Sequence, residues 1–176
     1  MATEANSDGL TDAQRALIGK RSPRTEAVNP VEASEVRRFL QATMNTLAVY
    51  DRSGSDRYGA AVAPPGFPVH AFRPDPADRD ILDRMDDPDF DGLRRDQRAG
   101  LPPVPTEFTR LLNGGYEYEI HALARIGDRI FRQSEYVDIA HKVGRSGPML
   151  IYRVRDSYTN QEGKPLLSVI ATTILR

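Results

Sequence analysis

The stretch GYEYEIHAL, residues 115–123, decides the fold class of this chain because apolar and polar side chains alternate along it. Alternation with a period of two is typical of a β-strand that packs one face on a core and turns the other to solvent. The apolar set is Tyr116, Tyr118 and Ile120, and the polar set is Glu117, Glu119 and His121. The stretch therefore predicts the first strand of a half-buried antiparallel sheet.

Three more strands are predicted after it, over 129–141, 148–159 and 165–175. The gaps between them are rich in glycine, asparagine and aspartate, which favour tight turns. Helices are predicted earlier, over residues 11–20 and from Pro30 onward. Because helices come first and an antiparallel meander comes last, the chain is predicted to be an α+β domain.

Both predicted helices have recognisable end signals. The first is capped by Thr11 or Asp12 and closed by Gly19. The second has Pro30 in its first turn, where a missing N–H group costs nothing. Its apolar residues at helical spacing are Val36, Phe39, Leu40 and Met44. This spacing predicts one apolar face packed on the sheet.

Length and composition limit the classes of function. A chain of 176 residues is typical of one domain. A formal net charge of −1 argues against a nucleic-acid-binding surface. The sequence has no cysteine, which excludes disulfides and a thiol nucleophile and favours the cytoplasm. No apolar run is long enough to span a membrane, and the three histidines are too scattered to predict a metal site.

The predicted organisation is one domain with an arm and an insertion. Residues 1–9 are small and polar, and they are predicted to be a disordered arm. The domain then occupies residues 10–176, with a proline-rich insertion at about 68–109. A loop of that length is usually functional, so the insertion is interpreted as a lid or, alternatively, as a solvated excursion.

Residues 45–51, NTLAVYD, are followed by RYG at 57–59 and VAPPGF at 62–67. This region resembles the active-site segment of the MaoC-like (R)-specific enoyl-CoA hydratases, which normally reads Asp-x-Asn-Pro-x-His and leads into a glycine at the start of a buried helix. Asn45 stands in the position of the aspartate, and Tyr50 stands in that of the histidine. The resemblance therefore preserves the spacing of the motif but not its reactive groups.

Further segments resemble the N-terminal-type domain of MaoC-like dehydratases, namely 113–121 (NGGYEYEIH), 142–148 (KVGRSGP) and 158–163 (YTNQEG). The resemblance implies a hot-dog fold, in which an antiparallel sheet wraps around a central helix that Gly66 and Phe67 would open. It also implies an acyl-CoA thioester as substrate or ligand, with no other cofactor. Domains of this type often lack the Asp/His pair, and a partner MaoC-type chain supplies it.

Hydration of an enoyl thioester requires a base that activates water and an acid that protonates the α-carbon. An asparagine is not a base at neutral pH and a tyrosine phenol is a weak one, so Asn45 and Tyr50 give no confident catalytic residue. Glu117 and His121 share one face of the first predicted strand, which makes them an alternative pair. The other reading is ordinary cross-strand pairing on a solvated face.

The motifs also predict where a thioester would bind. The candidate residues are Tyr58, Pro65, Gly66, Phe67, Asn113, Gly114, Gly115 and Arg145. The N–H group of Gly66 is suited to the enolate oxygen, unless Pro65 and Gly66 are only a turn. Arg145, with Lys142 and Arg153 or Arg155, can meet coenzyme A phosphates, or these cations are simply a solvated face.

Three hypotheses of function remain open from the sequence. The first is a non-catalytic subunit of a heteromeric enoyl-CoA hydratase or dehydratase, whose Asp/His pair comes from a MaoC-type partner. The second is a homodimer that binds an acyl thioester, or another apolar ligand, without turnover. The third is an active homodimer that uses different acid and base residues.

Overall fold

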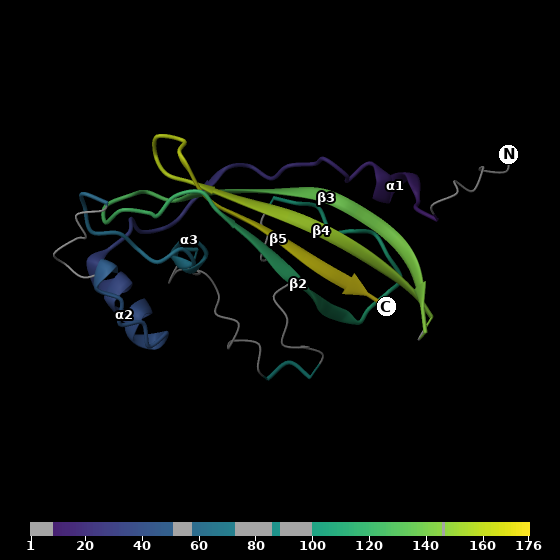
Figure 1. The fold of residues 1–176 in the computed structure, drawn as a ribbon. Helices are drawn as coiled ribbons and strands as arrows, with labels where there is room; N and C mark the ends of the chain where they lie inside the picture. Colours follow the sequence, from purple (N-terminus) through teal and green to yellow (C-terminus); the bar gives the residue numbers. More distant parts are fainter. Residues whose placement is uncertain (1–8, 51–57, 73–85, 89–99, 146) are drawn as a thin grey trace, which may run out of the picture.

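A five-stranded antiparallel sheet dominates the computed structural model of the chain (Figure 1). The structure describes residues 9–50, 58–72, 86–88, 100–145 and 147–176. The strands are β1 (Thr25–Glu26), β2 (Leu111–Ile120), β3 (Phe131–Gly144), β4 (Gly147–Thr159) and β5 (Pro165–Leu175). Their order across the sheet is β1-β3-β4-β5-β2, so β2 forms one edge. The α+β class and all four predicted strands are confirmed, but β2 is not half-buried as predicted, because the side chains of Tyr116, Tyr118 and Ile120 are exposed.

The strand β2 begins earlier than the sequence predicts. It pairs with β5 from Leu111 opposite Leu175, through a bulge at Asn113–Gly115, to its end at Ile120. The Asn113 side chain accepts a hydrogen bond from the Gly115 N–H group at 2.8 Å, and Gly115 has a φ of 111°. A glycine with positive φ is suited to a bulge, so the two glycines interrupt the ladder without ending the strand.

The core face of the sheet carries two hydrophobic clusters, one at each end. The first cluster lies under α2 (Ala33–Ala42) and α3 (Phe67–His70), and it includes Tyr158 and Leu167 of the sheet. The second lies at the opposite end and includes Leu150 and Val154, which are fully buried. Residues 101–108 and the segment of α1 (Asp12–Arg15) cover this second cluster (Figure 1).

The first helix is confirmed but is shorter than the predicted 11–20. Thr11 and Gln14 form a reciprocal capping box, which stabilises the N-terminus of α1. The helix ends at Arg15, and a turn leads to Gly19, whose N–H group donates to the Tyr136 carbonyl on β3 at 2.8 Å. The chain is thus drawn onto the sheet edge, and this contact replaces further helical hydrogen bonds.

The second helix starts later and ends earlier than predicted. Glu32 is the N-cap of α2, so Pro30 lies before the helix and not in its first turn. Val31 is held by a hydrogen bond from its N–H group to the Asp128 carbonyl at 2.8 Å, which keeps this segment extended. Met44 was predicted on the apolar face, but it follows the helix with a φ of 51° and is 87% exposed. The remaining apolar face packs on the sheet side as predicted.

The predicted central helix begins where the sequence indicated. Gly66 is the N-cap of α3, and the Phe67 ring is 2% exposed and packs against Phe39 at a centroid distance of 5.9 Å. The helix extends over four residues, and the chain after residue 72 lies outside the described residues until 86.

The predicted arm and insertion are described only in part. Residues 1–8 of the arm, and most of 68–109, lie outside the described residues. The end of the insertion packs on the sheet, because Tyr136 donates its hydroxyl hydrogen to the Pro102 carbonyl at 2.9 Å. Gln14 donates to the Pro105 carbonyl at 2.8 Å. Residues 101–108 thus contact the second cluster, and both interpretations of the whole insertion, as a lid or as a solvated excursion, stay predictions.

Candidate ligand pocket and degenerate active-site segment

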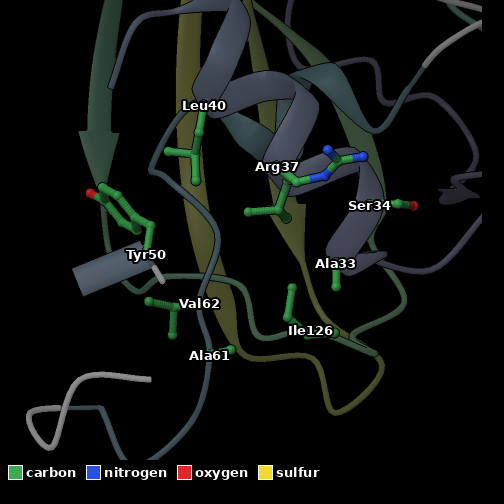
Figure 2. Close-up of a pocket in the computed structure, with 9 residues that line it drawn as sticks. Ala33, Ser34, Arg37, Leu40, Tyr50, Ala61, Val62 and Ile126 are labelled. Atoms are coloured by element: carbon green, nitrogen blue, oxygen red, sulfur yellow. The ribbon is translucent and has the colours of Figure 1, made fainter. Parts of the chain in front are cut away.

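A pocket of about 430 Å³ lies between α2 and the chain segment that precedes α3 (Figure 2). From α2 it is lined by Ala33, Ser34, Val36, Arg37 and Leu40. The remaining lining residues are Tyr50, Ala61, Val62 and Ile126. Its volume lies within the range of roughly 300–1,000 Å³ that is common for small-molecule sites. The lining is mainly aliphatic, with polar groups on three residues.

Tyr50 reaches this pocket from the short 3₁₀ helix η1 (Ala48–Tyr50). It is the residue at the position of the histidine in the resembling hydratases. Its hydroxyl makes no hydrogen bond to any described residue. Figure 2 shows its ring beside Leu40 and Val62, on the side of the pocket away from Ser34. Tyr50 is therefore a pocket residue with a free phenol, without a base beside it in the described chain.

Asn45 has a local structural role. Its side-chain oxygen accepts a hydrogen bond from the Leu47 N–H group at 3.0 Å, and its own N–H group donates to the Leu40 carbonyl at 2.9 Å. This Asx turn redirects the chain after α2. Within the described residues no hydrogen bond joins Asn45 to Tyr50. The two positions are thus not arranged as an acid/base pair.

The predicted thioester residues before α3 lie close together along the chain. Tyr58 and Pro65 are half-buried, and Gly66 is exposed. Gly66 has a φ of −77°, and an added Cβ would lie 3.8 Å from the Phe39 ring, an ordinary contact. Neither backbone conformation nor crowding requires glycine at this position. The close approach of a thioester to its N–H group stays a prediction.

Asn113, Gly114 and Gly115 have a complete structural explanation. They form the β2 bulge described above, and a Cβ on Gly114 would lie 2.7 Å from the Thr172 methyl carbon. All three are exposed at the sheet edge, so a ligand or a second chain has access to them. Their role in substrate binding stays a prediction.

Arg145 lies at the far end of the molecule from the pocket. It follows β3 in the hairpin to β4, beside the second cluster, and its side chain is exposed. The 13 residues of β4 separate this hairpin from the α2 end, roughly 40 Å at about 3.3 Å per residue. Within one chain the structure does not bring Arg145 together with Tyr50 and Gly66.

Glu117 and His121 are engaged with different partners. Glu117 accepts a hydrogen bond and ion pair from Arg153 at 2.5 Å. The Nε2 atom of His121 lies 2.9 Å from the Ser168 hydroxyl and 4.0 Å from the Glu119 carboxylate. These contacts lie on the outer face of the sheet, where the Glu117–Arg153 pair spans β5 and the His121–Ser168 contact joins His121 to β5. No contact between Glu117 and His121 is present in the described structure.

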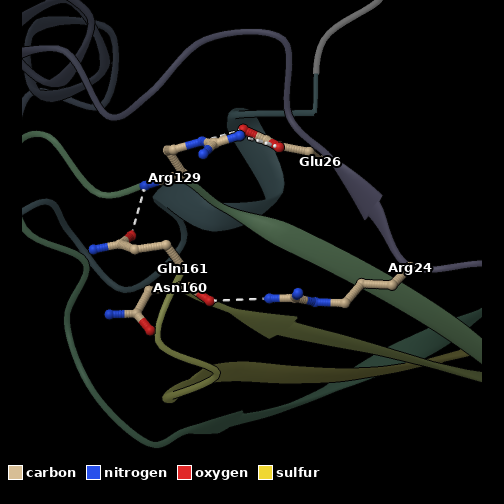
Figure 3. A network of polar contacts seen from close by, with 5 residues as sticks. All are labelled: Arg24, Glu26, Arg129, Asn160 and Gln161. Carbon is tan, nitrogen blue, oxygen red and sulfur yellow. Dashed lines mark hydrogen bonds and ion pairs between the residues drawn. The ribbon is translucent and has the colours of Figure 1, made fainter.

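Another predicted motif, residues 158–163, builds a turn and anchors the N-terminal segment. The Asn160 side chain accepts hydrogen bonds from the N–H groups of Glu162 and Lys164, both at 3.0 Å. Figure 3 shows Arg24 donating to the Asn160 carbonyl and Arg129 paired with Glu26. The Glu26 carboxylate, through its hydrogen bond and its charge, raises the pKa of Arg129. This polar network ties β1 to the end of β4.

Two features were not predicted from the sequence. A buried pair joins Ser134 to Asp156, whose carboxylate accepts the Ser134 hydroxyl hydrogen at 2.5 Å. Alternation along β4 puts Asp156 on the same face as Leu150 and Val154, so its burial could have been predicted. The pocket residues Ser34 and Arg37 were not predicted either, because apolar spacing along α2 indicates only the face that includes Phe39 and gives no signal for polar pocket residues.

Neither a metal-binding cluster nor a membrane-spanning helix is found among the described residues. Among the described residues, no group of three or more His, Cys, Asp or Glu side chains is arranged to hold a metal ion. In the part of the chain that the structure describes, no helix has both the length and the apolar character to cross a membrane.

Comparison with known proteins identifies a family. The profile described as "FAS1-like, dehydratase domain region" matches residues 16–169. No curated protein matches the chain. Several solved structures have the same fold, which is the hot-dog fold of MaoC-like dehydratases. The predicted hot-dog fold and the predicted resemblance to MaoC-like dehydratases are therefore confirmed.

Three of these structures are informative. A chain of the ChsH1–ChsH2 complex from Mycobacterium tuberculosis has a TM-score of 0.68 at 12% identity, over 93% of this chain and 88% of that one. A MaoC-like dehydratase from Rhodospirillum rubrum has a TM-score of 0.56 at 15% identity, over 90% and 91%. The HadBC (3R-hydroxyacyl-ACP dehydratase) complex from M. tuberculosis has a TM-score of 0.51 at 14% identity, over 90% and 96%.

Proposed function

We propose that this chain, which belongs to the FAS1-like dehydratase-region family, is a non-catalytic subunit of a heteromeric enoyl-CoA hydratase or dehydratase. In this proposal it binds an acyl-CoA thioester, and a MaoC-type partner contributes the Asp/His pair. The observation that carries the proposal is the state of the active-site segment. Asn45 is used in a turn, and Tyr50 replaces the histidine without a described base beside it.

The edge strand β2 supports assembly with a second chain. Tyr116, Tyr118 and Ile120 are 55%, 57% and 56% exposed, although their cross-strand partners Ala171 and Val169 are buried. Exposed aromatic side chains on the core face of an edge strand are typical of an interface. The outer backbone groups of β2 are also available for pairing with another strand. Both features would be satisfied by a chain that extends the sheet.

Antiparallel pairing along β2 would also explain the separation of the predicted binding residues. The strand runs from the hairpin end at Leu111 to the α3 end at Ile120. A partner that pairs antiparallel therefore lies with its own α3 end beside the hairpin end of this chain. In that arrangement Asn113, Gly115 and Arg145 approach the acid/base pair of the partner. The heteromeric relatives ChsH1–ChsH2 and HadBC make such an assembly the favoured one.

A second candidate is a binding protein without turnover, present as a homodimer. It is favoured by the pocket, which retains its volume although the reactive residues beside it are replaced. The third hypothesis, an active homodimer, would need another pair. Within the described residues, a candidate pair is Glu35 of α2 with His70 of α3. The Glu35 carboxylate oxygen lies 3.9 Å from the His70 Nε2 atom. Cytoplasmic location stays a prediction.

The test is a hydration assay with crotonyl-CoA and longer enoyl-CoAs, on the purified chain alone and after co-expression with a MaoC-type chain that retains Asp-x-Asn-Pro-x-His. We expect no turnover above background from the chain alone and full turnover from the pair. The size of the gain from an acid/base pair is about 10²–10⁴-fold per group. Turnover by the chain alone, lost in Glu35→Gln and His70→Asn, would instead support the active homodimer.

A further inference from the structure

We propose that the pocket between α2 and Tyr50 is a binding site for an aliphatic carboxylate, a molecule with one apolar chain and one anionic head. This site goes beyond the proposed function, because it lies in the degenerate half-site where no reaction is expected. It needs no partner chain, since every residue that the argument uses belongs to this polypeptide.

The interior of the pocket fits an apolar chain. Leu40 from α2 faces Val62 and Ile126 across it (Figure 2). The opposite wall is held by the main chain, because Val62 bridges to Arg125 and the Ile126 N–H group donates to the Ala61 carbonyl at 3.1 Å. A wall fixed by backbone hydrogen bonds does not collapse into the space, so an apolar ligand gains the burial free energy.

The head-group end is positive. Figure 2 shows the Arg37 guanidinium turned along α2 toward Ser34, away from Tyr50. Neither side chain has a hydrogen bond or ion pair with any described residue. The N-cap Glu32 makes no side-chain bond to the first turn of α2, so in the described part of the chain those N–H groups have no capping side chain. A guanidinium, a hydroxyl and free helical N–H groups together favour a carboxylate.

Among the described residues, no carboxylate is paired with Arg37. Glu35, in the same turn, accepts a hydrogen bond from Arg38 at 3.2 Å and lies 3.9 Å from His70, on the other side of α2. Arg38 is thus already paired with Glu35, whereas Arg37 lines the pocket. Replacing either arginine with glutamine removes one positive charge from α2, so Arg38 provides a matched control for Arg37.

The experiment titrates decanoate and decanol into the intact chain and follows methyl resonances of Leu40, Val62 and Ile126 by NMR. We expect saturable decanoate binding with shifts centred on these methyl groups. The variant Arg37→Gln should bind decanoate at least tenfold more weakly and bind decanol unchanged. The matched control Arg38→Gln should bind decanoate within about twofold of the original chain. A filled pocket, Ala61→Leu, should weaken both ligands.

Several results would overturn the proposal. These are no saturable binding of decanoate, equal affinity of Arg37→Gln and the original chain, an equal loss in Arg38→Gln, or shifts centred on the methyl groups of Ile120 on β2. The decanol titration keeps the test valid if a variant is less stable, because an unfolded pocket would lose both ligands. The heteromeric function is tested by turnover with a partner, so the two proposals fail independently.

Discussion

The two ends of the sheet differ in how their apolar surface is covered. At the hairpin end, residues 101–108 and the α1 segment lie directly on Leu150 and Val154, and burial is complete. At the other end, α2 and α3 cover the sheet but leave the pocket beside α2. Both ends are nevertheless close-packed around fully buried side chains, among them Ile130 and Leu167 at the α2 end. The two ends therefore differ in the space that is kept beside α2, which is where we propose that a ligand binds.

The largest effect is expected at the hairpin end. Leu150→Ala removes a side chain that is 0% exposed and leaves a cavity, so the free energy of unfolding should fall by about 2–5 kcal/mol. Urea denaturation measures this change. Binding of decanoate at the other end should persist under folding conditions. A loss below about 1 kcal/mol would contradict the close packing of the hairpin end.

A smaller loss of stability is expected at the β2 bulge. Gly114→Ala puts a Cβ 2.7 Å from the Thr172 methyl carbon, and overpacking of this kind costs about 1–3 kcal/mol. The matched control is Gly66→Ala, where the nearest atom lies at 3.8 Å. Thermal melts of both variants separate crowding from the general effect of replacing glycine. Combining Gly114→Ala with Thr172→Ser should recover part of the loss, and no recovery would argue against this contact.

Substitution of the exposed edge strand should change assembly more than folding. Tyr118→Arg puts a charge on the core face of β2, and we expect association with a MaoC-type partner to weaken at least tenfold, about 1.4 kcal/mol. The unfolding free energy of the chain alone should change by about 0.5 kcal/mol or less, as for exposed sites. Analytical ultracentrifugation and urea melts measure the two quantities. Unchanged association would exclude β2 as the interface.

The smallest effect on stability is expected at Gly66. Gly66→Ala should leave the free energy of unfolding within about 0.5 kcal/mol, since its φ is −77° and its surroundings are open. If a thioester approaches this N–H group, affinity for crotonyl-CoA in the assembled protein should nevertheless fall. Calorimetry of ligand binding provides the measurement. An unchanged affinity would remove Gly66 from the predicted binding residues and keep it as a helix start only.

Predictions from the sequence succeeded where the signal is local. Alternation located all four long strands, and Thr11, one of the two predicted caps, is the N-cap of α1. They failed at ends that depend on distant contacts. Gly19 leaves its helix for the Tyr136 carbonyl, and Val31 stays extended because it bonds to Asp128. Helical spacing alone could not predict that Met44 lies beyond the end of α2.

The sequence by itself determined the antiparallel sheet and the resemblance that the family match confirms, and it predicts that Asn45 and Tyr50 stand in place of the Asp/His pair. These depend on periodicity and on residue identity, which are local. Only the tertiary structure decided that Glu117 pairs with Arg153, and that α2 leaves a pocket with Arg37 at its rim. Such contacts depend on how elements that are far apart in the sequence pack together in space. The spacing of residues along the sequence does not predict that packing.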